Sequence, residues 1–245
     1  MKCTILGIGS GMPRPETNHA AIVFQTLEGN FLADCGEGTA KQLLRHGFNK
    51  DFLDAILITH YHPDHVAGLF MVMQMFYLEG RTKPLDLFLP ERPAAFLDAM
   101  HMFYTFEQRF GFQLKIRDMA EAELFHSNIS TLLNDHLLGY EEFIQKQQYP
   151  NMMQSYSVII REKTKSIAYT SDCHILSTLV PDLKKTDLII MDGMHPEAEA
   201  ILDFKNDYQN MVLLIHGLSE PLSAWLEDNT ADGMELAAEN KTYEI

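Results

Sequence analysis

Four residues that can bind metal ions lie within six positions of one another, in the segment Thr59-His60-Tyr61-His62-Pro63-Asp64-His65. Alternate residues of an extended chain point to the same side, so His60 and His62 can share one metal ion. The proline that follows helps to turn the chain, and Asp64 and His65 at the start of the next helix would then face a second ion. Imidazole and carboxylate ligands suit zinc, with manganese or iron also suitable. A chance cluster of surface histidines is disfavoured, because a strand end, a turn and a helix start follow one another in the required order.

This segment cannot fill two coordination spheres, so further ligands must come from later in the chain. Three candidates follow β-like runs: His136 follows ISTLLND, Asp172 follows SIAYTS and His216 follows MVLLI. The ends of such strands are where α/β proteins concentrate their chemistry. His126 competes with His136, and the longer β-like run before His136 favours that residue.

Short apolar strands and helices must position these residues. The sequence predicts strands at Cys3–Ile8, Ala21–Thr26, Phe31–Ala33, Ala55–Thr59, Leu85–Leu89, Gln113–Arg117, Ile129–Asn134, Ser157–Arg161, Ser166–Thr170, Leu188–Met191 and Met211–Ile215. It predicts helices at Thr39–His46, Val66–Leu78, Pro93–Phe106, Glu197–Phe204 and Pro221–Glu227. Tyr140–Gln154, rich in Gln and Asn, is expected to be a surface loop. No linker interrupts the pattern, so we expect one α/β domain over residues 1–245, with two sheets and helices outside them.

Composition excludes several classes of protein. The chain has 34 Asp and Glu against 19 Lys and Arg, a net charge of −15, which argues against a general nucleic-acid coat. Its 46% hydrophobic residues can form a core without disulfides, and three widely spaced cysteines predict neither a disulfide framework nor a zinc finger. The longest nearly apolar stretch, Val66–Leu78, is too short to span a bilayer. With no secretion signal at the start, we expect a cytoplasmic protein without a membrane partner.

These motifs resemble those of the metallo-β-lactamase superfamily and, within it, of the tRNase Z-like branch. The matching segments are GIGSGMP, FLADCGEGTAKQLLRHG, ITHYHPDHVAGL, YTSDC, DLIIMDG and LLIH. The resemblance implies a four-layer αβ/βα sandwich, in which two mixed β-sheets carry helices on their outer faces. It also implies a dinuclear metal site between the two sheets.

The resemblance further implies a role for each ligand. It gives His60, His62 and His136 to one metal ion, Asp64, His65 and His216 to the other, and Asp172 to both as a bridge. Two divalent ions, zinc or else manganese or iron, would bind a bridging hydroxide and clamp the oxygens of an in-line displacement. His195, in DGMHPEAEAI, matches a family histidine that protonates the leaving oxygen, and Asp192 would orient it.

Other residues near the motifs receive supporting roles. Asp34 ends a strand and is expected to accept a hydrogen bond from a metal-bound histidine, unless it is a plain turn carboxylate. Cys35 and Cys173 adjoin the site and are expected to pack in the core. The glycines of GIGSGMP lead into a strand and not a helix, so we expect a tight turn and no dinucleotide site. The many Met and aromatic residues of 66–112 are expected in the core, although a substrate pocket would also use them.

Departures from the tRNase Z pattern narrow the expected substrate. The segment from Leu137 to Asp172 contains no Gly-rich, basic arm of the kind that grips tRNA, and Glu220 stands where the branch has an arginine. We therefore expect a phosphodiesterase of small or cyclic phosphodiesters. RNA 3′ ends and tRNA remain possible substrates if a homodimer partner supplies the arm. Two different functions also fit the motifs: an acyl hydrolase of lactones, thioesters or β-lactams, and a non-catalytic metal-binding relative.

Overall fold

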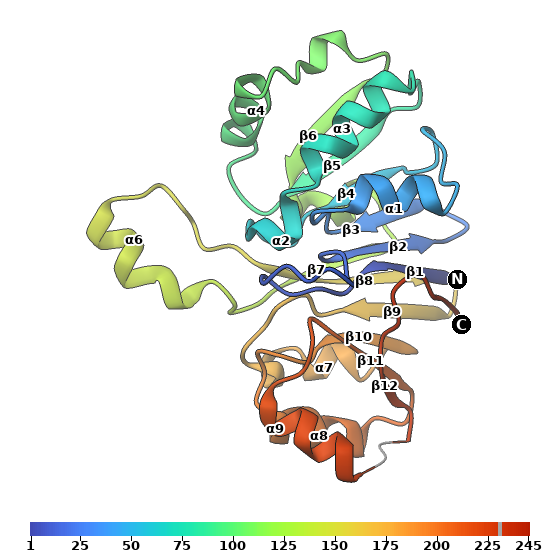
Figure 1. The fold of residues 1–245 in the computed structure, drawn as a ribbon, viewed down its shortest axis with the longest axis vertical. Helices are drawn as coiled ribbons and strands as arrows, with labels where there is room; N and C mark the ends of the chain where they lie inside the picture. Colours follow the sequence, from blue (N-terminus) through green and yellow to red (C-terminus); the bar gives the residue numbers. More distant parts are fainter. Residues whose placement is uncertain (230–231) are drawn as a thin grey trace.

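Two β-sheets lie face to face at the centre of the computed structural model, which describes residues 1–229 and 232–245 (Figure 1). One sheet has seven strands, in the order β13 (Thr242–Glu244), β1 (Lys2–Gly7), β2 (Ala21–Gln25), β3 (Asn30–Ala33), β4 (Ala55–Leu57), β5 (Leu85–Leu89) and β6 (Leu114–Asp118). The other has six, in the order β12 (Met234–Leu236), β11 (Met211–Ile215), β10 (Leu188–Asp192), β9 (Lys165–Tyr169), β8 (Tyr156–Glu162) and β7 (Ile129–Leu133).

Both sheets are mixed and follow the same plan. In the first, the pairs from β13 to β3 are antiparallel and those from β3 to β6 are parallel. In the second, β7, β8 and β9 are antiparallel, and β9 to β12 are parallel. Parallel strands bring their carboxyl ends to one edge of a sheet. The candidate ligands come directly after such strands in the sequence, so they lie at that edge.

Helices cover the two outer faces. The first sheet carries α1 (Thr39–Arg45), α3 (Leu69–Leu78) and α4 (Pro93–Met102), and the second carries α7 (Val180–Leu183), α8 (Ala198–Asp207) and α9 (Glu220–Asp228). The remaining α-helices are α2 (Pro63–Val66), α5 (Ala122–Phe125) and α6 (Glu141–Gln147). Single 3₁₀ turns span Glu107–Arg109, Met119–Glu121, Leu138–Tyr140 and Leu176–Thr178. None of the helices in these described ranges is long and apolar enough to cross a membrane.

Three buried clusters hold the layers together. The central cluster joins the inner faces of the two sheets and includes Ile5, Phe24, Tyr169 and Ile190. A second lies between the first sheet and its helices, and a third between the second sheet and its helices. Strands that are buried on both faces have continuous apolar sequences. Short apolar stretches such as MVLLI therefore predict these strands. The expected four-layer sandwich is confirmed.

Some element predictions are wrong. Residues Glu141–Gln147 form helix α6 inside the segment expected to be a loop, and Figure 1 shows this helix projecting away from the sheets. It buries none of its residues, so the sequence lacks the periodic apolar pattern that would predict a helix here. The edge strands β12 and β13 have three residues each and were not expected. The helix expected at Val66–Leu78 is divided, because α2 ends before Gly68 and α3 begins after it.

Two glycines lock the DCGEGT segment against the metal motif. The N–H of Cys35 donates to the carbonyl of His65 at 2.7 Å, and the N–H of Gly68 donates to the carbonyl of Cys35 at 2.9 Å. A Cβ on Gly68 would lie 2.0 Å from the carbonyl oxygen of Gly36, and one on Gly36 would lie 2.2 Å from that of Asp64. Only glycine allows the two segments to approach this closely.

Candidate metal centre

The metal motif lies where β4 ends. The chain stays extended as far as His62, whose φ is −64° and ψ 143°, so the side chains of His60 and His62 lie on one side. Pro63 then occupies the first turn of α2, where an N–H would have no helical partner. Asp64 and His65 follow in the same turn. The strand–turn–helix arrangement expected for this motif is present.

The first cluster of ligand atoms contains three histidines and one carboxylate. Nδ1 of His62 lies 3.1 Å from Nε2 of His60 and 3.0 Å from Nε2 of His136. Nε2 of His136 lies 3.5 Å from Oδ2 of Asp172. One ligand atom from each of the four residues lies within 4.8 Å of the others.

A second cluster shares Asp172 with the first. Oδ1 of Asp172 lies 3.3 Å from Nε2 of His65 and 2.7 Å from Nδ1 of His216. Oδ2 of Asp64 lies 3.6 Å from the same nitrogen of His65. His216 follows β11 and Asp172 follows β9, so the parallel strands of the second sheet deliver both residues to this edge.

Several atoms of the second cluster are buried without a hydrogen-bond partner. Within the described chain they are Nε2 of His65, Oδ1 of Asp172 and both ring nitrogens of His216. Leaving such an atom unsatisfied costs about 1–3 kcal/mol. The 2.7 Å contact between His216 and Asp172 lacks hydrogen-bond geometry, so the two atoms converge without bonding each other. Metal–nitrogen bonds of about 2.0–2.1 Å in a tetrahedron place ligand atoms roughly 3.3 Å apart, close to the separations found here. The residues fit a divalent metal ion.

Protonation favours metal binding by the first cluster. Burial lowers the pKa of His60 well below its usual value and that of His136 to about 4. Burial also lowers the pKa of His62. Neutral imidazoles have the lone pair that a metal ion needs.

The second cluster holds opposite charges. Burial alone would lower the pKa of His65, but the carboxylates of Asp172 and Asp34 outweigh it and raise that pKa well above its usual value. Burial alone would raise the pKa of Asp172, but His216 and His65 outweigh it and hold that pKa well below its usual value. Asp172 is therefore held as an anion, and a metal cation bound here would meet that negative charge.

Asp34 supports the cluster as expected. Nδ1 of His65 donates to its Oδ2 at 2.7 Å, and the hydroxyl of Tyr169 donates to the same oxygen at 2.7 Å. The backbone N–H of Thr59 donates to its other oxygen at 2.8 Å. These bonds fix the ring of His65 and turn Nε2 toward Asp172. Sequence reasoning identified Asp34 but missed its partners Thr59 and Tyr169, because no sequence pattern marks either of them as contacting a carboxylate.

Three non-glycine residues at this edge adopt left-handed backbone conformations. The φ angles are 57° for Asp34, 52° for Ser171 and 63° for His216. Such conformations cost of order 1–3 kcal/mol each and cluster at functional sites. The chain bends sharply here to present the side chains that follow each strand.

His195 and Asp192 form a hydrogen-bonded pair beside the clusters. Nδ1 of His195 donates to Oδ2 of Asp192 at 2.8 Å, and the same nitrogen lies 3.7 Å from Oδ2 of Asp172. The hydrogen bond to Asp192 raises the pKa of His195, and the charge of Asp172 adds to the effect. Asp192 is fully buried at the end of β10, while His195 is partly exposed.

These side chains open into a cleft of about 590 Å³. Its lining residues are Ser10, Gly11, His62, Pro63, Asp64, His136, Gly139, Tyr140, Asp172, His174, Met194 and His195. No Lys or Arg is among these described residues. Tyr140 and Ser10 were not singled out by the sequence, because neither stands in a ligand-like pattern.

His126 lies elsewhere. Its Nε2 is 3.2 Å from Oδ2 of Asp86, and its ring packs edge-on against Phe31 and Phe88. His126 is absent from the ligand clusters of the described residues, whereas His136 lies in one of them. Cys35 and Cys173 are buried thiols whose pKa values burial raises, as packing residues require.

Comparison with known proteins supports the fold. Ribonuclease Z of Shouchella clausii (strain KSM-K16) is 26% identical over 251 residues, which cover 99% of this chain and 75% of that protein. Alignments to other ribonuclease Z proteins cover only 29–53% of those proteins. The crystal structure of human tRNase Z, short form, gives a TM-score of 0.74 at 19% identity, with 100% of this chain and 99% of that chain aligned. The metallo-β-lactamase fold protein YhfI from Bacillus subtilis gives 0.75 at 18% identity, over 99% of this chain and 98% of that chain.

The sequence-based prediction of a metallo-β-lactamase fold in its tRNase Z-like branch is therefore confirmed, and the chain is a metal-dependent hydrolase. A family profile described as "Anti-Pycsar protein Apyc1" matches residues 1–243. Because that match spans almost the whole sequence, the chain belongs to the anti-Pycsar protein Apyc1 family.

Proposed function

We propose that this protein is a dinuclear metal-dependent phosphodiesterase that acts on small or cyclic phosphodiesters. The observation that carries the proposal is the pair of ligand clusters that share Asp172. In the second cluster, buried atoms of His65, Asp172 and His216 lack hydrogen-bond partners within the described chain. Two divalent ions a few ångströms apart are a recurring arrangement in phosphodiester cleavage.

In this proposal each cluster holds one ion. His60, His62 and His136 would hold the first ion, Asp64, His65 and His216 would hold the second, and Asp172, which lies in both clusters, would serve both. The ions, zinc or else manganese or iron, would activate water near neutral pH and neutralise charge on the phosphate. The chain's own contribution is to fix the ligands, and Asp34 does so by holding the ring of His65.

His195 is proposed as the proton donor to the leaving oxygen. Its hydrogen bond to Asp192 fixes the ring at Nδ1, and the raised pKa favours the protonated imidazole. The ring lines the cleft, where its Nε2 proton can pass to an ester oxygen that departs.

Charge and surface support a compact substrate. The relatives named ribonuclease Z act on RNA, which needs a positively charged path for its backbone. This chain carries a net charge of −15, and its cleft lining includes neither Lys nor Arg among the described residues. Phosphate contacts would then come from cationic His195, backbone N–H groups and bound metal ions, a set that suits a single diester better than a polymer.

The test is hydrolysis of bis(p-nitrophenyl) phosphate by protein reconstituted with zinc or manganese, followed as p-nitrophenolate release. Asp64→Ala should reduce turnover by at least about 100-fold and lower metal content, because it removes a ligand. Asp98→Ala is a matched control, since Asp98 is an exposed carboxylate on α4. Absence of turnover in fully metallated wild-type protein would overturn the proposal.

An acyl hydrolase is the second candidate, because an apolar pocket lined by Leu137, Phe143 and Ile144 adjoins the cleft. Assays of the same metal-loaded protein on a series of lactones and thioesters distinguish the acyl hydrolase from the phosphodiesterase. Acyl turnover without diester turnover would favour the second candidate.

A further inference from the structure

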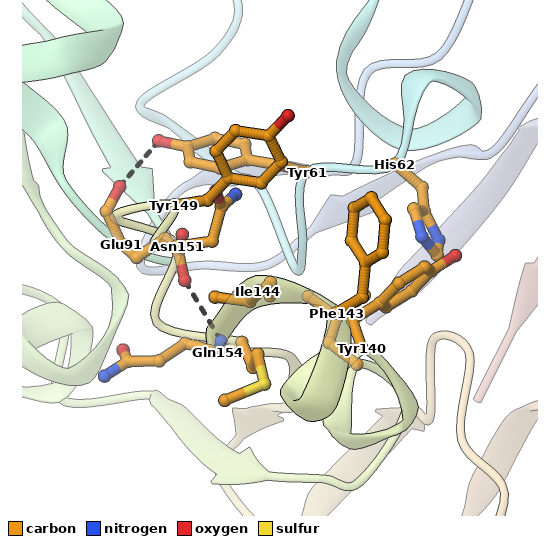
Figure 2. Close-up of a pocket in the computed structure, with 11 residues that line it drawn as sticks. Tyr61, His62, Glu91, Tyr140, Phe143, Ile144, Tyr149, Asn151 and Gln154 are labelled. Carbon is orange, nitrogen blue, oxygen red and sulfur yellow. Dashed lines mark hydrogen bonds between the residues drawn. The ribbon is translucent and has the colours of Figure 1, made fainter. Parts of the chain in front are cut away.

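Four polar side chains line the metal cleft without belonging to either ligand cluster: Ser10, Tyr140, His174 and His195. The ring of Tyr140 stands edge-on to the imidazole of His62, with 5.7 Å between the ring centroids, and Figure 2 shows its phenol beside the His62 ring. His195 is the proposed proton donor. Among the described residues of the lining, His174 is therefore the histidine to which the proposed mechanism gives no role.

A carboxylate from a neighbouring loop fixes the backbone of His174. Oδ1 of Asp135 accepts hydrogen bonds from the backbone N–H groups of His174 at 2.9 Å and of Ile175 at 3.1 Å. Asp135 directly precedes the proposed ligand His136, and His174 lies two residues after the proposed ligand Asp172. The carboxylate therefore joins two loops that carry ligands, and charge-assisted hydrogen bonds of this kind are among the stronger ones in proteins. They fix the point at which the side chain of His174 leaves the backbone.

The ring of His174 contacts two other imidazoles. It stacks on His136, with 5.3 Å between the ring centroids and 26° between the planes, and it stands edge-on to His195 at 5.3 Å and 88°. The residue is exposed and lines the cleft, and its ring nitrogens have no hydrogen-bond partner within the described chain. The ring is therefore held in place by its neighbours while its nitrogens stay available to a molecule in the cleft.

A phosphate group in this cleft needs hydrogen-bond donors, because neither Lys nor Arg is among the described lining residues. An imidazole carries at least one N–H in either protonation state, so His174 can donate a hydrogen bond whether or not it is charged. Hydrogen bonds from N–H to a phosphate oxygen are charge-assisted and strong. Since the rings of His174 and His195 lie 5.3 Å apart, hydrogen bonds of about 2.7–3.2 Å from the two rings can reach different oxygens of one phosphate group.

We propose that His174 is a phosphate-binding residue, whose imidazole donates a hydrogen bond to a non-bridging oxygen of the phosphodiester while His195 serves the leaving oxygen. The inference rests on the proposed function and adds to it a residue that holds the phosphate group. A non-bridging oxygen is present in the bound diester as well as in the transition state. An interaction made equally in both states lowers KM and leaves kcat unchanged.

The experiment uses two substitutions that separate the donor from the ring. His174→Gln keeps an N–H donor without a ring, and His174→Phe keeps a ring beside His136 without a donor. On bis(p-nitrophenyl) phosphate, with zinc- or manganese-loaded protein, we expect His174→Phe and His174→Ala to raise KM at least about five-fold and to leave kcat within about two-fold of wild type. His174→Gln should keep both constants within about two-fold of wild type.

His46→Ala is the matched control and should change neither constant, since His46 is a partly exposed histidine that stacks on Phe48 and does not line the cleft. A wild-type KM in His174→Phe with a raised KM in His174→Gln would mean that the ring only packs against His136, and would overturn the proposal. A wild-type KM in His174→Ala would overturn it as well.

Binding of inorganic phosphate to the metal-loaded protein, measured by calorimetry, decides the question independently of turnover. Weaker binding by His174→Phe and His174→Ala than by wild type and His174→Gln, at equal metal content, supports the contact even if the diester is not cleaved. Absence of turnover in the wild type would count against the proposed function only. Equal phosphate affinities in all four proteins would overturn the role of His174 while leaving the phosphodiesterase intact. Loss of metal in His174→Ala would assign the residue to the support of His136 and would also overturn the proposal.

Discussion

At the scale of single residues, His136 and His126, the two candidates for the third histidine ligand, lie in different environments. The ring of His136 converges on His62 and Asp172, whereas that of His126 pairs with Asp86 against Phe31. We predict that His136→Ala lowers the metal content from about two ions per chain to about one. His126→Ala should leave it unchanged. Elemental analysis of dialysed protein measures both, and equal metal loss in the two variants would refute the assignment.

His195 permits a test that separates proton donation from structure. Because a poor leaving group needs a proton and a good one does not, we predict that His195→Ala slows a diester with an alkoxide leaving group about 100-fold or more. The same variant should slow a p-nitrophenolate diester less than about ten-fold. The readout is the ratio of the two kcat values. Equal losses on both esters would assign His195 to positioning of the site.

Chemistry-bearing residues were the most predictable part of the molecule. His60, His62, Asp64 and His65 stand close together in the sequence, and their spacing alone brings them to one edge. The pairing of His195 with Asp192 was expected and is present. The contacts of Tyr169 and Thr59 with Asp34 were not foreseeable, since they depend on how the two sheets face each other.

At the scale of elements, the approach of DCGEGT to α2 sets the position of the ligands. A Cβ on Gly36 would lie 2.2 Å from the carbonyl of Asp64, so the helix that carries Asp64 and His65 would have to move. We predict that Gly36→Ala lowers zinc affinity at least about ten-fold while the protein stays folded. Gly139→Ala is the control, because a Cβ there meets no atom within 4 Å. Competition with a coloured chelator measures the affinity, and wild-type affinity in Gly36→Ala would contradict the prediction.

Arg81 joins the loop before β4 to the loop before β5 through hydrogen bonds. Its fully buried guanidinium donates to the carbonyls of Lys50, Leu53, Lys83 and Pro84 at 2.6–2.8 Å. Its planar group also lies over the rings of Phe76 and Phe112. The ammonium of lysine cannot reproduce this fork of donors.

Arg81→Lys should therefore destabilise the protein by about 2–4 kcal/mol, which for a chain of this size lowers Tm by roughly 5–15 °C. Zinc content at room temperature should not change, because none of the contacts of Arg81 involves a ligand residue. Arg109→Lys, at an exposed arginine, should shift Tm by no more than about 2 °C. A thermal melt measures both, and equal shifts would refute the role of Arg81.

Among the elements, helix α6 shows the limit of sequence reasoning. The strands could be predicted because their apolar runs are buried on both faces, as in Leu188–Met191. Helix α6 buries no residue, and Phe143 and Tyr149 line a pocket that Glu91 also lines. Glu91 accepts hydrogen bonds from the backbone N–H groups of Met152 and Gln154. Hydrophobic periodicity in a sequence marks the face that a helix buries against the core. It does not mark an exposed helix that lines a pocket.

At the scale of the whole molecule, metal binding should contribute to stability. The two sheets meet at unsatisfied buried atoms of His65, Asp172 and His216. We predict that removing the metal with a chelator lowers Tm by about 8–16 °C, since ligand at about 1,000 times its Kd stabilises by roughly 4 kcal/mol. Restoring zinc should restore Tm. His216→Ala should respond much less to the chelator, and an identical response would count against metal binding at this edge.

Each sheet runs from antiparallel to parallel strands, and each contributes a different part of the cleft. His60, His62 and His65 follow the first sheet, while Asp172 and His216 follow the second. Neither half of the chain holds all of the proposed ligands, so a centre of the proposed kind would form only when the two halves have docked. A nascent or partly unfolded chain would therefore be unable to hydrolyse its substrate, and activity would begin only once folding is complete.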